Sequence, residues 1–209
     1  MRMRRKPNLA ARIERCAHLL VTKPELLQGH WLDEFGYREL RIEIGCGKGR
    51  FTVETAKAKP DVFFVALEKS ENVIVIALER AAAEGLQNVR FINALADDLM
   101  DFFALEEVSR IYINFCDPWP SNRHVKRRLT EQRFLELYRK ILVPGGEVHF
   151  KTDNLPLFEF SVREFRRNNF ELLEIIRDLH KNGPVDIMTD YEKKFYEQCL
   201  PIFKCIIKK

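Results

Sequence analysis

Short apolar or alternating stretches recur along the chain, separated by longer stretches in which apolar residues return every three or four positions. The short stretches are rich in Val, Ile and Phe and are bounded by Gly, Asn, Asp or Pro, which predicts β-strands. The expected strands are residues 40–44, 62–67, 89–92, 111–115 and 148–152. Two further strand-like stretches, 171–175 and 203–207, lie near the C-terminus.

The longer stretches between the strands predict helices. Residues 72–84 are rich in Ala, Leu and Glu and stop at Gly85. A helix is expected over 131–142, with Thr130 as its N-cap, and another opens at Asn154. Strand and helix alternate, which favours an α/β fold with a mostly parallel, seven-stranded sheet, an antiparallel edge strand and helices on both faces.

The length of 209 residues predicts a single domain over 1–209, with a basic arm and helices in 1–37 and the core in 38–209. Hydrophobic residues make up 46% and charged residues 32%, so disordered and low-complexity classes are excluded. The longest apolar runs, 62–67 and 73–78, are far shorter than a membrane span needs, so no membrane partner is expected.

The five cysteines are scattered and include no C-x-x-C pair, which favours a reducing compartment and a cytoplasmic location. The histidines show no metal-ligand spacing, so no metal is expected.

Positive charge is concentrated in two clusters, and the rest of the chain is net acidic. The clusters are Arg2, Arg4, Arg5 and Lys6, and Arg123, Lys126, Arg127 and Arg128. Such clusters suit a polyanionic partner, because each Lys or Arg that meets a phosphate releases counterions. Charge runs are also common on plain solvated surfaces, so the clusters alone leave both interpretations open.

A glycine-rich turn with acidic neighbours follows the first expected strand. Gly45, Gly47 and Gly49 let the backbone turn sharply and approach a ligand where the next helix begins. The spacing E-x-G-x-G-x-G differs from the dinucleotide fingerprint G-x-G-x-x-G. Together with Glu43 before the turn and Glu68 at the end of the second strand, it resembles the S-adenosylmethionine site of class I methyltransferases.

The fourth expected strand runs into Asp117-Pro118-Trp119-Pro120, and the second basic cluster follows at once. Two prolines around a tryptophan stiffen the chain, which fixes Asp117 at the mouth of the sheet. An aromatic residue beside cations is also how proteins grip unstacked bases and their phosphates.

Together, these motifs resemble those of a known protein family. The D-P-W-P sequence followed by R-H-x-K-R-R-L, the E-x-G-x-G-x-G turn, and the downstream runs K-T-D-N and M-T-D-Y-E are similar to bacterial tRNA (guanine-N(7)-)-methyltransferases over nearly the whole chain. The resemblance implies a Rossmann-like class I methyltransferase fold and transfer of a methyl group from S-adenosylmethionine to N7 of a guanine in the tRNA variable loop. A monomer or a homodimer is expected.

The resemblance also implies roles for individual residues. Cofactor binding is expected at Glu43, Gly45, Gly47, Gly49, Glu68, Leu95 and Asp117, with Asp117 also catalytic. Substrate binding is expected at Ser121, Arg123, His124, Lys126, Arg127, Arg128, Asp153, Thr189, Asp190, Tyr191 and Glu192. Two positions depart from the family pattern, because Leu95 replaces its usual acid near the adenine and Ser121 replaces its usual lysine.

Three other classes of function compete with this interpretation. A methyltransferase acting on an exocyclic amine of a nucleic acid would share the cofactor turn but resemble N/D-P-P-Y/W after the fourth strand, and here Trp119 follows Pro118. A nicotinamide oxidoreductase would need the other glycine spacing. A noncatalytic RNA-binding module would leave Glu43, Glu68 and the glycines unexplained.

Overall fold

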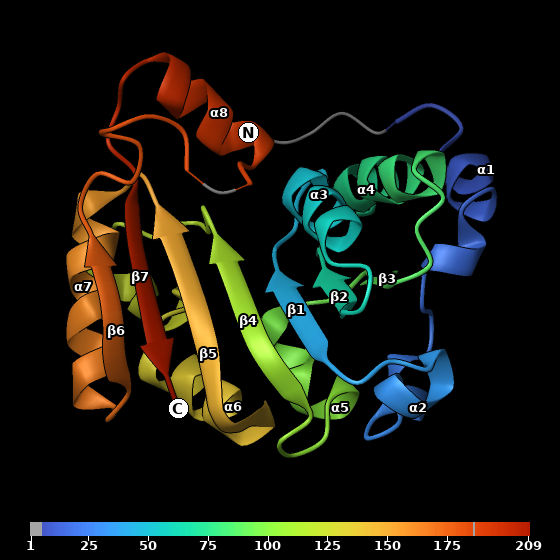
Figure 1. Cartoon of the computed structure of the whole chain (residues 1–209), viewed down its shortest axis with the longest axis horizontal. Helices are drawn as coiled ribbons and strands as arrows, with labels where there is room; N and C mark the ends of the chain where they lie inside the picture. The colour runs from blue at the N-terminus through green and yellow to red at the C-terminus, as the bar shows by residue number, and fades with distance from the viewer. Residues whose placement is uncertain (1–5, 186) are drawn as a thin grey trace.

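The computed structural model describes residues 6–185 and 187–209, so Arg2, Arg4 and Arg5 of the first basic cluster lie outside the described residues. Seven strands form one sheet in the order β3-β2-β1-β4-β5-β7-β6 (Figure 1). Their bounds are β1 Leu40–Ile44, β2 Phe63–Leu67, β3 Val89–Ile92, β4 Val108–Asn114, β5 Leu142–Thr152, β6 Glu171–Ile176 and β7 Phe203–Lys208.

Strands β1 to β5 pair in parallel, and β7 runs antiparallel to both of its neighbours, β5 and β6. The expected mostly parallel sheet with an antiparallel edge is therefore confirmed, and the reversed strand lies one position inside the edge. Strand β5 begins earlier than expected, directly after the preceding helix, because Leu142 already pairs with Val108 of β4 ahead of an irregularity in the ladder.

Eight α-helices and four short 3₁₀ helices surround the described sheet. The α-helices are α1 Leu9–Glu14, α2 Trp31–Phe35, α3 Arg50–Ala58, α4 Glu71–Ala83, α5 Leu99–Phe102, α6 Gln132–Ile141, α7 Leu155–Arg167 and α8 Asp190–Glu197. The 3₁₀ helices are Ala17–Leu19, Pro24–Leu27, Ala96–Asp98 and Asn122–Arg127. Within the described ranges, no helix combines the length and apolar character that crossing a bilayer requires.

Two helix starts show how tertiary contacts modify the local signals. Asn154 caps α7 as expected, since its side chain accepts a hydrogen bond from the Leu157 backbone. The Thr130 cap is wrong: Glu131 caps α6, and the fully buried Thr130 hydroxyl bonds to the Ser161 hydroxyl at 2.7 Å. The hydroxyl is thus used between helices, where burial makes a partner necessary.

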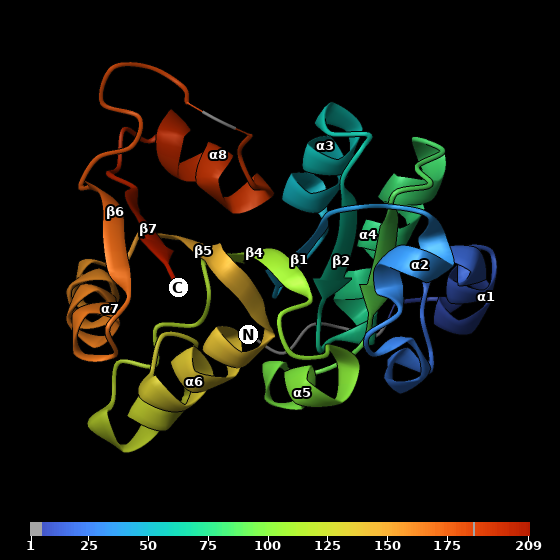
Figure 2. The same cartoon turned by 60° about the horizontal axis from the view of Figure 1, so that its bottom comes forward.

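The sheet separates two hydrophobic cores. Figures 1 and 2 show from two directions that helices lie on both of its faces. Alternate residues of each strand face opposite sides. In β2, Phe63 and Val65 pack with α2, α5 and α6, whereas Phe64 and Ala66 pack with α3 and α4. Helices thus cover both faces. Strand β2 is buried on both sides, which explains why its sequence is apolar throughout.

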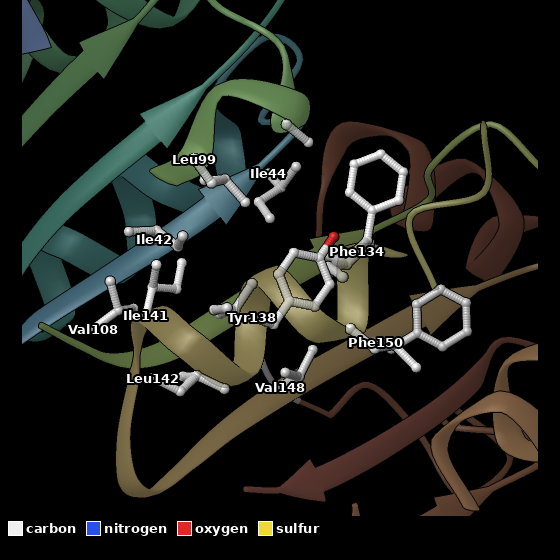
Figure 3. Packing of buried hydrophobic residues seen from close by; sticks show 14 of the residues in the cluster. Ile42, Ile44, Leu99, Val108, Phe134, Tyr138, Ile141, Leu142, Val148 and Phe150 are labelled. Carbon is white, nitrogen blue, oxygen red and sulfur yellow. The ribbon is translucent and has the colours of Figure 1, made fainter. Parts of the chain in front are cut away.

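The larger core also supports the loop that follows β4. Figure 3 shows α6 laid against the sheet, with Tyr138 and Ile141 packed towards Ile42 and Val148. Tyr138 is buried, and its hydroxyl donates a 2.9 Å hydrogen bond to the Leu129 carbonyl at the end of the second basic cluster. The core therefore fixes one end of that loop.

Candidate active site

The strand order reverses between β1 and β4, and this leaves a crevice beyond the carboxyl ends of these strands. Such a switch point is where parallel α/β sheets bind ligands. Residues that follow β1, β2 and β4 therefore meet at one edge of the sheet, close to α8 in Figure 1.

The glycine turn after β1 is built from three residues in the left-handed region, with φ of 79° at Gly45, 58° at Gly47 and 75° at Gly49. The Gly45 and Cys46 amides donate to the Leu67 carbonyl at 2.8 and 2.9 Å, which holds the turn against the end of β2. At Gly49 a Cβ atom would come within 2.9 Å of the Ala77 backbone on α4. Close packing of α3 on α4 thus requires glycine there.

Glu68 is attached to this turn. One of its carboxylate oxygens accepts from the Gly47 amide at 3.2 Å and the other from the Ser70 amide at 2.9 Å. The side chain is half-buried and lines a pocket at this edge. An acid held at this point, at the end of the second strand, is placed to accept hydrogen bonds from ribose hydroxyls.

Glu43 lies below the turn and is fully buried. Its carboxylate accepts hydrogen bonds from the Thr52 hydroxyl and, at 2.9 Å, from the Asn114 amide. Burial raises the pKa of Glu43, and the two hydrogen bonds and the nearby Lys151 ammonium oppose this rise. Among the described residues, the buried Oδ1 of Asn114 has no hydrogen-bond partner. An acid and an unpaired acceptor side by side suit a cationic group that donates hydrogen bonds.

Two adjoining pockets share Gly45, Gly47 and Phe115. The larger, of about 730 Å³, also contains Glu68, Leu95 and Asp117. The smaller, of about 310 Å³, contains Glu43, Gly49, Asn114 and the start of α8. All seven residues expected to bind the cofactor therefore line one or both pockets: Glu43, Gly45, Gly47, Gly49, Glu68, Leu95 and Asp117.

Asp117 stands at the mouth of the larger pocket with its side chain 65% exposed. Two aromatic residues flank it in the chain and have left-handed backbone, Phe115 at φ 53° before it and Trp119 at φ 42° after it. Such backbone is costly for a non-glycine residue, and it persists only where surroundings fix it. The Asp117 carboxylate accepts a 3.3 Å hydrogen bond from the Lys69 ammonium, across the pocket mouth. The carboxylate is therefore accessible to a ligand.

Most of the second basic cluster lies in the 3₁₀ helix Asn122–Arg127, which Ser121 caps and which Arg128 follows. The four cationic side chains of the cluster differ in their exposure to solvent. Arg123, Lys126 and Arg127 are exposed, and the Arg127 guanidinium lies 4.9 Å from the centre of the Trp119 ring. Arg128 instead turns inward and donates to the carbonyls of Pro118 and Trp119 at 3.0 to 3.3 Å. Arg128 thus holds the turn that carries Asp117.

The residues from Thr189 to Glu192 also differ in whether they face a pocket or are buried in the protein. Thr189, Asp190 and Tyr191 line the smaller pocket, whereas Glu192 is fully buried and lines neither pocket. Asp153, directly after β5, also lines neither pocket. Ser121, Arg123, His124 and Lys126 lie outside both pockets, on the same loop as Arg127.

Sequence reasoning missed Asn114 and Lys151. Each is a polar residue in the last two positions of its strand, β4 or β5, and each is buried. A polar residue at the carboxyl end of a buried strand is a signal that could have found both, since such a residue must be paired at the ligand-binding edge.

The two cysteines at this edge are poor nucleophiles. Burial raises the pKa of Cys116 to about 12 and the pKa of Cys46 well above its ordinary value. The thiolate is the reactive form of cysteine, and these thiols stay protonated near neutral pH. Across the described ranges there is no grouping of three or more His, Cys, Asp or Glu side chains suited to a metal ion.

Fold and site together define a Rossmann-like methyltransferase. Residues 37–205 match the family model described as "Putative methyltransferase". Over 207 residues the chain is 45% identical to a tRNA (guanine-N(7)-)-methyltransferase of Geobacillus kaustophilus (strain HTA426), which covers 98% of this chain and 95% of that protein. The chain belongs to the tRNA (guanine-N(7)-)-methyltransferase family.

Solved structures share the fold at low sequence identity. The 16S rRNA methyltransferase KamB superposes with a TM-score of 0.64 at 14% identity, covering 85% of this chain and 91% of that one. The tRNA (m1A58) methyltransferase TrmI from Aquifex aeolicus gives a TM-score of 0.56 at 18% identity, with coverage of 90% and 68%. These similarities confirm the Rossmann-like methyltransferase architecture.

Proposed function

We propose that this protein transfers a methyl group from S-adenosylmethionine to N7 of a guanine in tRNA, and that the guanine lies in the variable loop. The observation that carries the proposal is the meeting of the glycine turn, Glu68 and Asp117 around one pocket, in a chain 45% identical to a tRNA (guanine-N(7)-)-methyltransferase. The exposed cations beside that pocket supply the contact surface for an RNA backbone.

The residues present fit the cofactor. Glu68 would hold the ribose hydroxyls, and Leu95, which is 50% exposed in the larger pocket, would contact the adenine through apolar surface. Glu43 and the unpartnered Oδ1 of Asn114 would receive the cationic methionine end in the smaller pocket. When bound, the cofactor supplies an electrophilic methyl group on a sulfonium sulfur.

The chain needs to supply position and electrostatics but no strong base. N7 of guanine has an in-plane lone pair and loses no proton when it is methylated. The Asp117 carboxylate can accept hydrogen bonds from the guanine edge and stabilise the positive charge that develops on the base. Phe115 and Trp119, on either side of Asp117 in the chain, give the base apolar surfaces that exclude water.

The function is tested by locating the transferred methyl group. Unmodified bulk tRNA is incubated with the protein and radiolabelled S-adenosylmethionine, and the product is cleaved at 7-methylguanine. We expect one labelled guanine in the variable loop. Label on an exocyclic amine would instead support the exocyclic-amine methyltransferase named above, and label outside the variable loop would contradict that part of the proposal.

Loss of the Glu68 carboxylate is expected to weaken cofactor binding. Glu68→Ala removes an acceptor for ribose hydroxyls and releases the Gly47 amide. Hydrogen bonds to charged groups contribute about 1.5–3 kcal/mol, so we expect the dissociation constant to rise roughly 10- to 150-fold. Equilibrium dialysis with labelled S-adenosylmethionine measures this. Glu84→Gln, on the surface end of α4, is the control, and equal affinities of the two variants would remove Glu68 from the site.

Substitutions of Arg127 and Arg128 are expected to have different effects, although the sequence predicts that both residues contact the RNA. Arg127→Ala should weaken tRNA binding and lower the slope of log affinity against log salt by about one, with thermal stability unchanged. Arg128→Ala should leave the slope nearly unchanged and lower the unfolding free energy by about 1–3 kcal/mol, because the Trp119 carbonyl loses its donors.

Filter binding at several salt concentrations and thermal unfolding give the two measurements. Arg123→Ala is the matched comparison for Arg127, because it is also an exposed arginine of the same 3₁₀ helix. If Arg128→Ala lowered the salt slope as much as Arg127→Ala, the inward role of Arg128 would be wrong.

A further inference from the structure

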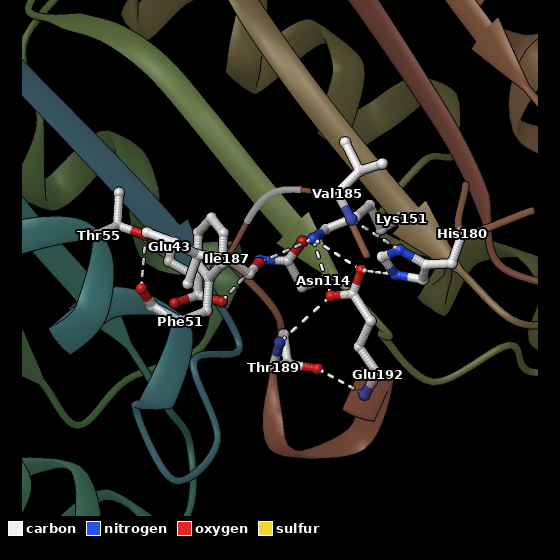
Figure 4. Close-up of polar contacts among 10 residues, drawn as sticks. All are labelled: Glu43, Phe51, Thr55, Asn114, Lys151, His180, Val185, Ile187, Thr189 and Glu192. Atoms are coloured by element: carbon white, nitrogen blue, oxygen red, sulfur yellow. Dashed lines mark hydrogen bonds and ion pairs between the residues drawn. The ribbon is translucent and has the colours of Figure 1, made fainter. Parts of the chain in front are cut away.

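A buried cluster of charged side chains lies beside the smaller pocket without lining it (Figure 4). Glu192 of α8 has 0% exposure, and its two carboxylate oxygens lie 3.2 and 2.8 Å from the Lys151 ammonium at the end of β5. His180, in the segment between β6 and α8, has its Nε2 atom 2.9 Å from Glu192 Oε1. Three separate parts of the chain thus meet at one carboxylate.

The surrounding hydrogen bonds assign the proton on His180. Its Nδ1 atom accepts from the Val185 amide at 3.2 Å, so Nε2 carries the hydrogen and donates it to Glu192. Glu192 also accepts from the Thr189 amide at 3.2 Å, and its own amide donates to the Thr189 hydroxyl, which completes a capping box. With these donors in place, the carboxylate of Glu192 is satisfied inside the protein.

The same cluster determines where the start of α8 lies. Asp190 and Tyr191 directly precede Glu192 and line the smaller pocket. Asp190 accepts a 2.6 Å hydrogen bond from Arg80 on α4, and the Tyr191 ring lies 5.3 Å from the Phe115 ring. Helix α8 therefore connects the β5 side of the crevice with α4 and the loop after β4.

We propose that Lys151, His180 and Glu192 form a latch that holds the start of α8 over the smaller pocket, and that they are positioning residues for methyl transfer. Within the proposed function, they place Thr189, Asp190 and Tyr191 against the bound substrates and do not touch tRNA themselves. The Lys151 ammonium also faces Glu43 and lowers its pKa, so one cation serves both the latch and the cofactor acid.

The test compares three single variants, Lys151→Met, His180→Ala and Glu192→Gln, with His18→Ala as an exposed-histidine control. For the latch variants we expect the amides of residues 189–197 to exchange hydrogen at least about 10-fold faster, while the amides of β1 to β4 keep their wild-type rates. Displacement of pocket residues by about 1 Å can cost 100-fold, so we expect kcat/KM to fall roughly 10- to 100-fold, mainly through KM.

The outcomes separate a latch from direct contact with the substrate. Should Glu192→Gln lose activity while exchange at 189–197 stays as in the wild type, Glu192 touches the substrate and the proposal is overturned. The same holds if His180→Ala changes neither exchange nor KM, and this milder variant remains informative if Lys151→Met does not fold. If wild-type protein failed to methylate tRNA, the proposed function would fall, whereas the exchange comparison would still decide whether the latch exists.

Discussion

Replacing Asp117 by asparagine is expected to lower the single-turnover rate of methyl transfer about 100- to 1,000-fold with cofactor bound. The carboxylate is exposed at the mouth of the larger pocket and lies three residues after the end of β4, the strand whose end forms the site. Removal of one group that stabilises developing charge typically costs this much. Asparagine keeps the size of the side chain but cannot balance the positive charge that methylation places on the base.

The measurement is rapid mixing of the enzyme–cofactor complex with excess unmodified tRNA. Asp101→Asn serves as the control, because Asp101 is an exposed acid on α5 that lines neither pocket. We expect the control to react at the wild-type rate. A near-normal rate for Asp117→Asn, with cofactor saturating, would remove Asp117 from the reaction and leave it as a surface acid paired with Lys69.

Gly49→Ala is expected to lower the free energy of unfolding by about 2–5 kcal/mol and the cofactor affinity at least about 10-fold. A left-handed φ of 75° costs an alanine about 1–2 kcal/mol. The added methyl would also come within 2.9 Å of the Ala77 backbone, so α3 would have to move away from α4, and overpacking of this kind costs about 1–3 kcal/mol. Movement of α3 also displaces the turn that precedes it.

Gly85→Ala separates the cost of left-handed backbone from the cost of overpacking. Its φ of 65° is similarly left-handed, but nothing in the described structure lies within 4 Å of the added methyl. We expect this variant to lose only about 1–2 kcal/mol and to bind cofactor normally. Thermal unfolding of the two variants gives the comparison. Equal loss of stability would show that α3 and α4 do not pack as closely as the structure has them.

The sheet could be predicted from the sequence because its central strands are buried on both faces. Residues 62–67 are apolar throughout and fully or almost fully buried, and the glycines and the acid that follow β1 and β2 are close to these strands in the chain. Motifs of this kind are local, so the turn at Gly45 and the acid at Glu68 could be placed before any tertiary contact was known.

Contacts between distant segments could not be predicted in the same way. Arg128 reads as one more cation in a basic run, and only the folded turn shows that it donates to the Trp119 carbonyl. The resemblance implies that Glu192 binds the substrate, yet its carboxylate is buried against Lys151, which lies 41 positions earlier in the chain. The capping box from Thr189 to Glu192 is the one local signal that could have indicated α8.

The central claim is that the edge of the sheet between the Gly45 turn, Glu68 and Asp117 is a single cofactor site. Calorimetric titration of the folded wild-type protein with S-adenosylmethionine tests it most directly. We expect one molecule to bind per chain, with binding heat that Glu68→Ala and Gly49→Ala reduce. Absence of binding heat from protein that unfolds cooperatively, or binding heat that neither substitution changes, would contradict the account.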